Sequence, residues 1–247
     1  MLSARADPDN SHLWSEYARA SGATLATRPT SPPTTCIGSF EVFNYPTNRA
    51  VVVYWQQLEE KYHSGPNFRY QIVQVLEDER RVKRVASEVT DSHAKFNILP
   101  SHHGYTFHVN SVNDEGAAPG SSSVFVPSKQ EISDLIPRAV TVIYSNDDPE
   151  TIKISWFKPS SSSNSAVVRN YTIFWCQKQR VVQRRCDGRL EFAVVEPQSR
   201  SSSSDVVTFL DDSNHDTLLY QLSLPADVSY SFSVSGNSVS GSSSGKI

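Results

Sequence analysis

The sequence predicts an all-β protein built from two antiparallel sandwiches of about seven strands each, preceded by the tail of a third module. Three observations carry this prediction: short runs alternate apolar with polar residues, turn-rich stretches separate the runs, and one pattern of aromatic residues occurs twice. Alternation with a period of two is typical of a half-buried strand. No long stretch keeps the apolar period of an amphipathic helix.

An internal repeat divides the chain into two copies of one unit. Trp55 is followed fifteen residues later by Tyr70, and Trp156 is followed at the same interval by Tyr171. The pattern Leu-Pro-x4-Tyr-x-Phe-x-Val also occurs twice, at residues 99–109 and 224–234. Shared spacing at a fixed interval indicates repeated modules of one fold.

Four aromatic residues are expected to form the structural core of the two modules. The Leu-Pro-x4-Tyr element indicates a tyrosine corner, in which a Tyr between the two sheets buries its ring while its hydroxyl bonds nearby backbone. Tyr105 and Tyr230 take this position in the two copies. The upstream tryptophans, Trp55 and Trp156, are expected to fill the centre of each sandwich.

The repeat also predicts the domain boundaries. Residues 1–31 form the tail and connector of a preceding module, residues 32–127 the first complete module, and residues 135–247 the second. The linker at residues 128–134 is short and polar, so only limited bending between the modules is expected. Both ends of the chain resemble cut ends, so a signal peptide and a membrane anchor are expected outside it.

The second module carries an insertion. Pro100 lies thirty residues after Tyr70, whereas Pro225 lies fifty-four after Tyr171, which leaves twenty-four extra residues in the second module. A candidate strand at residues 190–195 lies in this region.

The cysteines favour an extracellular environment. Cys176 lies on the predicted third strand of the second module, and Cys186 follows a loop that leads into the next strand. Neighbouring strands place such residues within the reach of a disulfide, whose Cα atoms lie no more than about 7 Å apart. Two buried free thiols of an intracellular protein are the alternative.

Asn170 begins an Asn-Tyr-Thr sequon and is a candidate glycosylation site. Cys36 either pairs outside this chain or is a buried thiol.

Composition excludes several classes of function. The 23 basic residues nearly balance the 26 acidic ones, giving a net charge of −3, whereas a general nucleic-acid binder is strongly basic. The longest apolar run, residues 50–55, is far shorter than the roughly 20 residues of a membrane-spanning helix. No catalytic motif and no cofactor-binding or metal-ligating pattern is found. We therefore predict a protein that is not an enzyme and has no cofactor.

These residues resemble the fibronectin type III module, although Pro follows Leu directly in both copies, which departs from the usual spacing of that module. Two further patterns resemble class I cytokine receptors. Trp14, Ser15 and Tyr17 match a degenerate Trp-Ser-x-Trp-Ser box, and Cys176 begins a Cys-x9-Cys-x-Gly-x-Leu-x-aromatic pattern. Membrane-proximal modules of relatives of the interleukin-6 receptor signal-transducing chain, insect members included, have a similar pattern. A Trp-Ser ending is also common in other fibronectin modules.

The resemblance implies a non-catalytic extracellular fragment of a single-pass cytokine receptor in the plasma membrane. Such a fragment spaces a ligand-binding module from the membrane and orients receptor chains for signalling. The implied partners are a secreted cytokine, bound mainly through a region upstream of this chain, and a second receptor chain. The alternative is a cell-adhesion or guidance receptor whose fibronectin modules bind other surface proteins directly.

A basic cluster, Arg80-Arg-Val-Lys-Arg84, lies in a connection or edge strand of the first module. Two interpretations are open. The cluster is either a surface for an acidic partner or sulfated glycan, or a charged edge strand that prevents edge-to-edge pairing.

Overall fold

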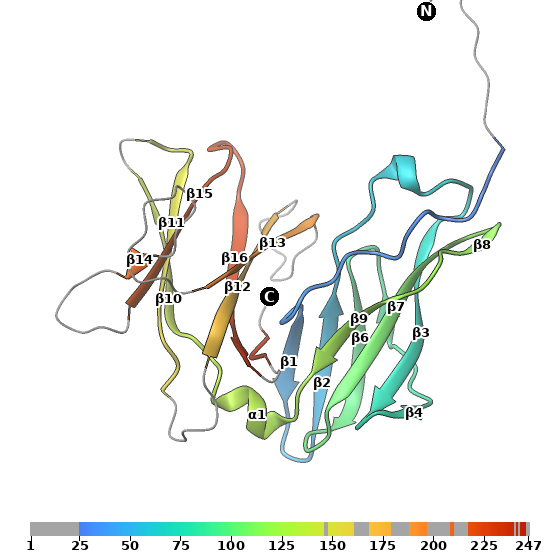
Figure 1. The fold of residues 1–247 in the computed structure, drawn as a ribbon, viewed down its shortest axis with the longest axis horizontal. Helices are drawn as coiled ribbons and strands as arrows, with labels where there is room; N and C mark the ends of the chain where they lie inside the picture. The colour runs from blue at the N-terminus through green and yellow to red at the C-terminus, as the bar shows by residue number, and fades with distance from the viewer. Residues whose placement is uncertain are drawn as a thin grey trace, which may run out of the picture.

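The computed structural model describes residues 25–145, 148–160, 168–178, 188–196, 208–209, 217–239, 241 and 243–245. Two β-sandwiches lie side by side, and the short helix α1 (Lys129–Ser133) connects them at one end (Figure 1). The predicted all-β fold of two tandem fibronectin type III modules is confirmed by the strand order in each sandwich.

The first module consists of two antiparallel sheets. One sheet has the order β1 (Phe40–Asn44), β2 (Asn48–Tyr54), β6 (His93–Pro100) and β5 (Glu88–Val89). The other has the order β4 (Arg80–Val82), β3 (Arg69–Glu77), β7 (Tyr105–Asn113) and β8 (Gly116–Ala117), with β9 (Ser122–Val126) also paired to β7. A single 3-10 turn, η1 (Glu60–Tyr62), interrupts the connection between β2 and β3.

The second module repeats this plan in its described residues. One sheet has the order β10 (Arg138–Tyr144), β11 (Thr151–Phe157), β15 (Thr217–Ser223) and β14 (Thr208–Phe209). The other has the order β13 (Leu190–Val195), β12 (Val168–Gln177) and β16 (Tyr230–Ser238). The strand expected at residues 190–195 is therefore confirmed.

Each core is centred on the Trp–Tyr pair that defines the repeat. Trp55 and Trp156 are both fully buried. The rings of Trp55 and Tyr70 lie 5.5 Å apart, and those of Trp156 and Tyr171 lie 5.3 Å apart. The fifteen-residue spacing recurs because in each module it brings a Trp from one sheet against a Tyr from the other. Contacts of this kind stabilise a core by about 0.5–1.5 kcal/mol beyond the area that they bury.

The tyrosine corner of the first module lacks the expected hydrogen bond from the Tyr105 hydroxyl to the backbone. The Tyr105 ring is fully buried, but its hydroxyl lies beside Glu77 and Arg84 instead of bonding backbone, and burial followed by the nearby Glu77 raises its pKa to about 12. Arg49 bonds the backbone of this corner loop instead, where its Nη2 donates to His103 O at 2.7 Å.

Tyr230 also differs from the expectation. Its side chain is only half-buried, at the start of β16, whereas its counterpart Tyr105 lies wholly inside the first module. Its pKa is raised by burial and by Asp227. The second corner is therefore closer to solvent than the first.

The linker is joined to the first module through its apolar residues. Ile132 is buried and packs against the core of that module, with Ile136 partly buried beside it. Leu135 is also buried. The backbone N–H of Ser128 donates to the Glu131 carboxylate at 3.0 Å, which caps the first turn of α1. The polar residues of the linker thus face solvent, while its aliphatic residues pack against the protein and hold the linker in one orientation.

Arg49 is expected to stabilise the lower end of the first module. Its fully buried side chain donates to Pro127 O at 2.6 Å and to His103 O at 2.7 Å. Arg49→Met leaves these carbonyls without their donors, although it also removes the cost of burying a charge. We therefore expect a loss of about 2 kcal/mol in unfolding free energy, measured by urea denaturation. The exposed Arg69→Met is the control, and equal losses in the two variants would contradict the assignment.

The ion pair beside Tyr105 predicts an acid-sensitive contribution to stability. Arg84 donates to Glu77 at 2.8 Å, and this hydrogen bond is the main reason why the pKa of Glu77 is lowered. A carboxylate with a lowered folded pKa stabilises above its unfolded pKa of about 4.3 and loses that effect as pH falls through the folded value.

We therefore expect the unfolding free energy to decline from about pH 5 towards pH 3. Glu77→Gln should flatten this decline and cost no more than about 1 kcal/mol at neutral pH, because the pair is partly exposed. Denaturant titrations at a series of pH values provide the measurement. A wild-type slope in the variant would show that Glu77 is not responsible.

Candidate functional site: the interface between the two modules

Strand β2 is buried on both of its faces. Val51 and Val53 point into the core of the first module, whereas Val52 and Tyr54 point out of it, yet all four are at most 1% exposed. An outward-facing pair of apolar residues in a two-layer sandwich normally meets water. Here the second module covers it.

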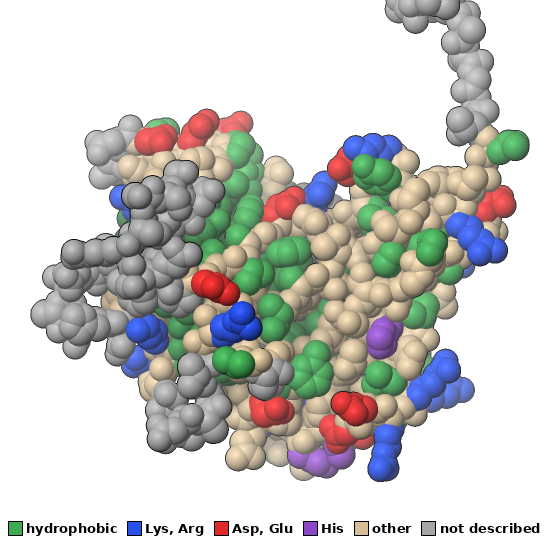
Figure 2. Space-filling model, viewed as in Figure 1, with side chains coloured by type: hydrophobic (Ala, Val, Ile, Leu, Met, Phe, Trp, Pro, Cys, Tyr) green, Lys and Arg blue, Asp and Glu red, His purple; other side chains and the backbone are tan. Residues whose placement is uncertain are grey.

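The covering surface is the outer face of the β13-β12-β16 sheet. Phe174 and Cys176 on β12 and Leu190 on β13 are each 1% exposed. They form one apolar cluster with Val52 and Tyr54, here called the interface cluster, with Cys36, Phe43 and Phe192 partly buried at its margin. Hydrophobic side chains are also visible along the boundary between the modules in Figure 2. The two sandwiches therefore pack sheet face against sheet face.

Polar contacts surround the interface cluster. Thr172 Oγ1 donates to Ile37 O of the first module at 3.0 Å. Gln56 Nε2 donates to the Glu191 carboxylate of the second at 2.7 Å. Hydrogen bonds of this kind each stabilise by about 0.5–1.5 kcal/mol, and their directions fix the lateral register of the two faces.

Small residues permit a close approach on one side of the cluster. Gly38 has a φ of +85°, and a Cβ there would lie 2.5 Å from Ser235 Oγ of the second module. Ser243 and Ser244 are buried with Ser235, and the Ser235 and Ser243 hydroxyls are 2.5 Å apart. At Gly245 a Cβ would lie 2.3 Å from the Phe40 ring of the first module. These glycines need to be small because serine side chains at Gly38, and the Phe40 ring at Gly245, occupy the space that a Cβ would take.

The connector before the first module is also held in place. Asn113 Nδ2 donates to Thr27 O at 2.7 Å, and Ser122 Oγ donates to Pro33 O at 2.5 Å. Thr34 exchanges backbone hydrogen bonds with Gln56. The chain therefore enters the first module along a fixed line from residue 27 onward.

The predicted cysteine and glycan sites lie on or beside this interface. Cys176 is disulfide-bonded, while Cys186, its predicted partner, lies outside the described residues, so the pairing stays a prediction. Cys36 is a free thiol, and burial raises its pKa to about 12 against a smaller opposing effect of Ser39. Asn170 is half-buried, and its Oδ1 accepts a hydrogen bond from Asn237 at 2.8 Å. Its glycosylation stays a prediction.

The degenerate box at Trp14, Ser15 and Tyr17 lies outside the described residues. Within the described ranges, no group of three or more His, Cys, Asp or Glu residues is arranged to hold a metal ion. No helix in that part of the chain is both long enough and apolar enough to span a bilayer.

Sequence reasoning missed the interface residues, although a signal for them was present. Residues 50–55 form an uninterrupted apolar run, and a run without alternation is typical of a strand buried on both faces. Phe174, Trp175 and Cys176 on β12 form a shorter run of the same kind. Buried Ser235, Ser243 and Ser244 gave no such signal, because serine is common in loops.

Comparison with known proteins gives one related receptor. No family model matches the chain. A curated cytokine receptor of Drosophila melanogaster is 29% identical over 188 residues, which cover 75% of this chain and 14% of that receptor. The FN1-FN3 domains of chicken CNTN1 are a solved structure with a TM-score of 0.29 and 19% identity, covering 89% of this chain and 66% of the other. The chain thus resembles fibronectin type III modules of a cytokine receptor and spans a small part of that relative's length.

Proposed function

We propose that this chain is a non-catalytic extracellular fragment of a single-pass cytokine receptor, which spaces the ligand-binding module from the membrane and orients receptor chains. The observation that carries the proposal is the interface cluster. It contains fully buried side chains from both modules, so the two sandwiches form one body. The similarity to a cytokine receptor favours this role over the adhesion alternative.

Rigidity follows from the energy of the cluster. Fully burying a Val, Leu or Phe side chain contributes roughly 1.5–3 kcal/mol, and separating the modules returns several such side chains to water. The free energy needed to separate the modules is therefore several times the thermal energy of about 0.6 kcal/mol, so the arrangement in which the two modules are packed together dominates. A rotation of the first module is therefore transmitted to the second module.

The proposed partners follow from the same role. A secreted cytokine binds mainly to a region upstream of this chain, and a second receptor chain meets the membrane-proximal part. The fixed path of the connector from Thr27 to Thr34 supports the proposal, because a preceding module attached to it leaves in a defined direction. The proposed location is the outer side of the plasma membrane.

Phe174→Ala should uncouple the unfolding of the two modules. Truncating a buried Phe costs about 3–5 kcal/mol, and here the lost contacts belong to the interface cluster. We expect a single cooperative transition in the wild-type chain and two separated transitions in the variant, measured by urea denaturation with fluorescence and circular dichroism.

Phe125→Ala is the matched control, because Phe125 is 42% exposed on β9. It should cost about 1 kcal/mol or less and keep one transition. If Phe174→Ala behaves like this control, the modules are not coupled through the cluster.

In the full-length receptor, disrupting the interface should reduce signalling without reducing ligand capture. Val52→Asp places an unpaired carboxylate in a fully buried apolar contact, which costs several kcal/mol. We expect a several-fold lower maximal response in a reporter cell line, with normal surface level and normal ligand affinity. An unchanged response at equal surface level would refute the orienting role, while loss of ligand affinity would assign the interface to ligand binding.

A further inference from the structure

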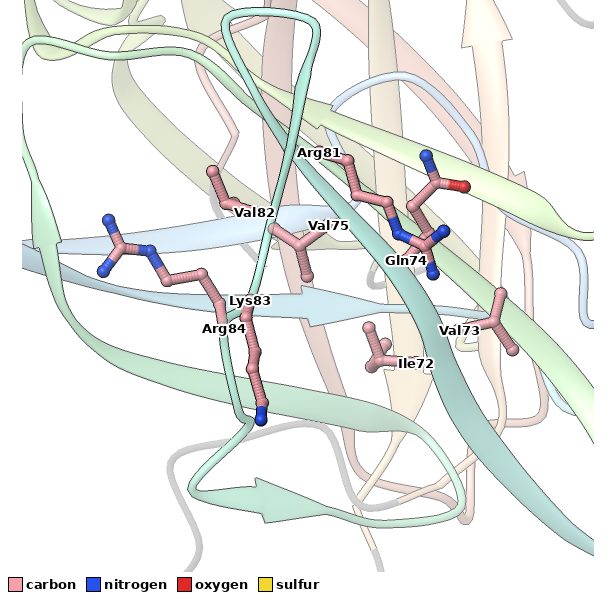
Figure 3. A pocket seen from close by; sticks show the side chains of 8 residues that line it. All are labelled: Ile72, Val73, Gln74, Val75, Arg81, Val82, Lys83 and Arg84. Carbon is pink, nitrogen blue, oxygen red and sulfur yellow. The ribbon is translucent and has the colours of Figure 1, made fainter.

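A groove of about 450 Å³ opens on the first module, away from the interface cluster, where β3 and β4 separate. The two strands pair only from Val75 to Glu77 on β3. The last pair, Val75 and Val82, and Ile72 beyond it form the floor of the groove (Figure 3). Ile72 and Val82 are partly buried and pack against the module's core, so the floor is apolar and firm.

One wall of the groove is an open strand edge. On the side away from β7, residues 69–74 of β3 pair with no strand in the described part of the chain. The ladder to β7 is interrupted between Ile72 and Gln74, where Val73 bulges out and is 40% exposed. An open edge presents backbone donors and acceptors that a further extended segment can satisfy.

The other wall is basic. Arg81 and Lys83 line the groove and are exposed, and neither forms an ion pair within the described residues. Arg84 is different because it donates to Glu77 at 2.8 Å and points away from Val73 and Gln74 in Figure 3. Arg80, also exposed, adds a third cation beside Arg81. The free charge beside the open edge is therefore positive.

We propose that this groove binds an extended, acidic segment of a partner protein, which adds to the free edge of β3 as a strand. Backbone hydrogen bonds to β3 supply affinity, alternate side chains reach the apolar floor, and acidic side chains pair with Arg81 and Lys83. The same cations repel a second copy of this edge, because like charges on paired edges oppose association. Arg81 and Lys83 thus oppose the pairing of two copies of this edge and favour the pairing of β3 with an acidic strand.

A sulfated glycan is the competing anionic ligand, and the geometry favours a peptide over it. Glycan sulfates need only an exposed basic strip, whereas this site adds an apolar floor and an unpaired backbone edge. Both extra features match the needs of a β-strand.

The test measures binding of a short fluorescein-labelled peptide of alternating Glu and Val to the whole chain by fluorescence anisotropy. We expect saturable binding that weakens with salt and is roughly tenfold or more weaker in Arg81→Glu/Lys83→Glu. Lys61→Glu/Lys129→Glu, which changes net charge equally at exposed sites outside the groove, should bind like wild type. Melting temperatures confirm that both variants fold.

A second probe separates strand addition from simple charge attraction. The same peptide carrying N-methyl groups on alternate residues keeps its charge but loses donors to β3, so its binding should be lost. Equal binding of the methylated peptide would overturn the proposal. So would binding of a heparin oligosaccharide without binding of the peptide, or failure of the peptide to bind at all.

Discussion

The arrangement of this protein depends on the burial of β2 on both of its faces. Val51 and Val53 belong to the core of the first module, while Val52 and Tyr54 belong to the contact with the second. A strand of this kind leaves no apolar face for solvent, so the first module reaches its lowest free energy only when another surface covers it. The β12 face, with Phe174 and Cys176, provides that surface, and the remaining contacts determine its position.

The fold followed from features that any sandwich of this type requires. The repeated Trp–Tyr spacing reflects ring contacts across each core, and the alternating runs reflect strands with one buried face. The tyrosine corner was predicted less well. Its ring position follows from the pattern, but the Tyr105 hydroxyl lies beside Glu77 and Arg84, and the donor to the backbone of this corner loop is Arg49, which lies more than fifty residues away in the sequence. A local pattern carries no information on such a distant donor.

The interface was harder to predict for a different reason. The apolar run at residues 50–55 is too short for a membrane-spanning helix, and double burial of a strand explains it. A single sequence shows that a face is apolar but does not show which surface covers it. The linker illustrates the same limit, because its polar residues indicated a spacer while Ile132 and Leu135 hold it against the modules.

The central claim is that the two modules form one rigid body. The most direct test is the distance distribution between spin labels on Val85→Cys and Ile143→Cys, both exposed positions on different modules, measured by pulsed electron paramagnetic resonance. The thiol of Cys36, partly buried and with a raised pKa, should label poorly. One narrow distribution is the expected result. A broad distribution with several distances would contradict the account, because it would show that the modules move independently.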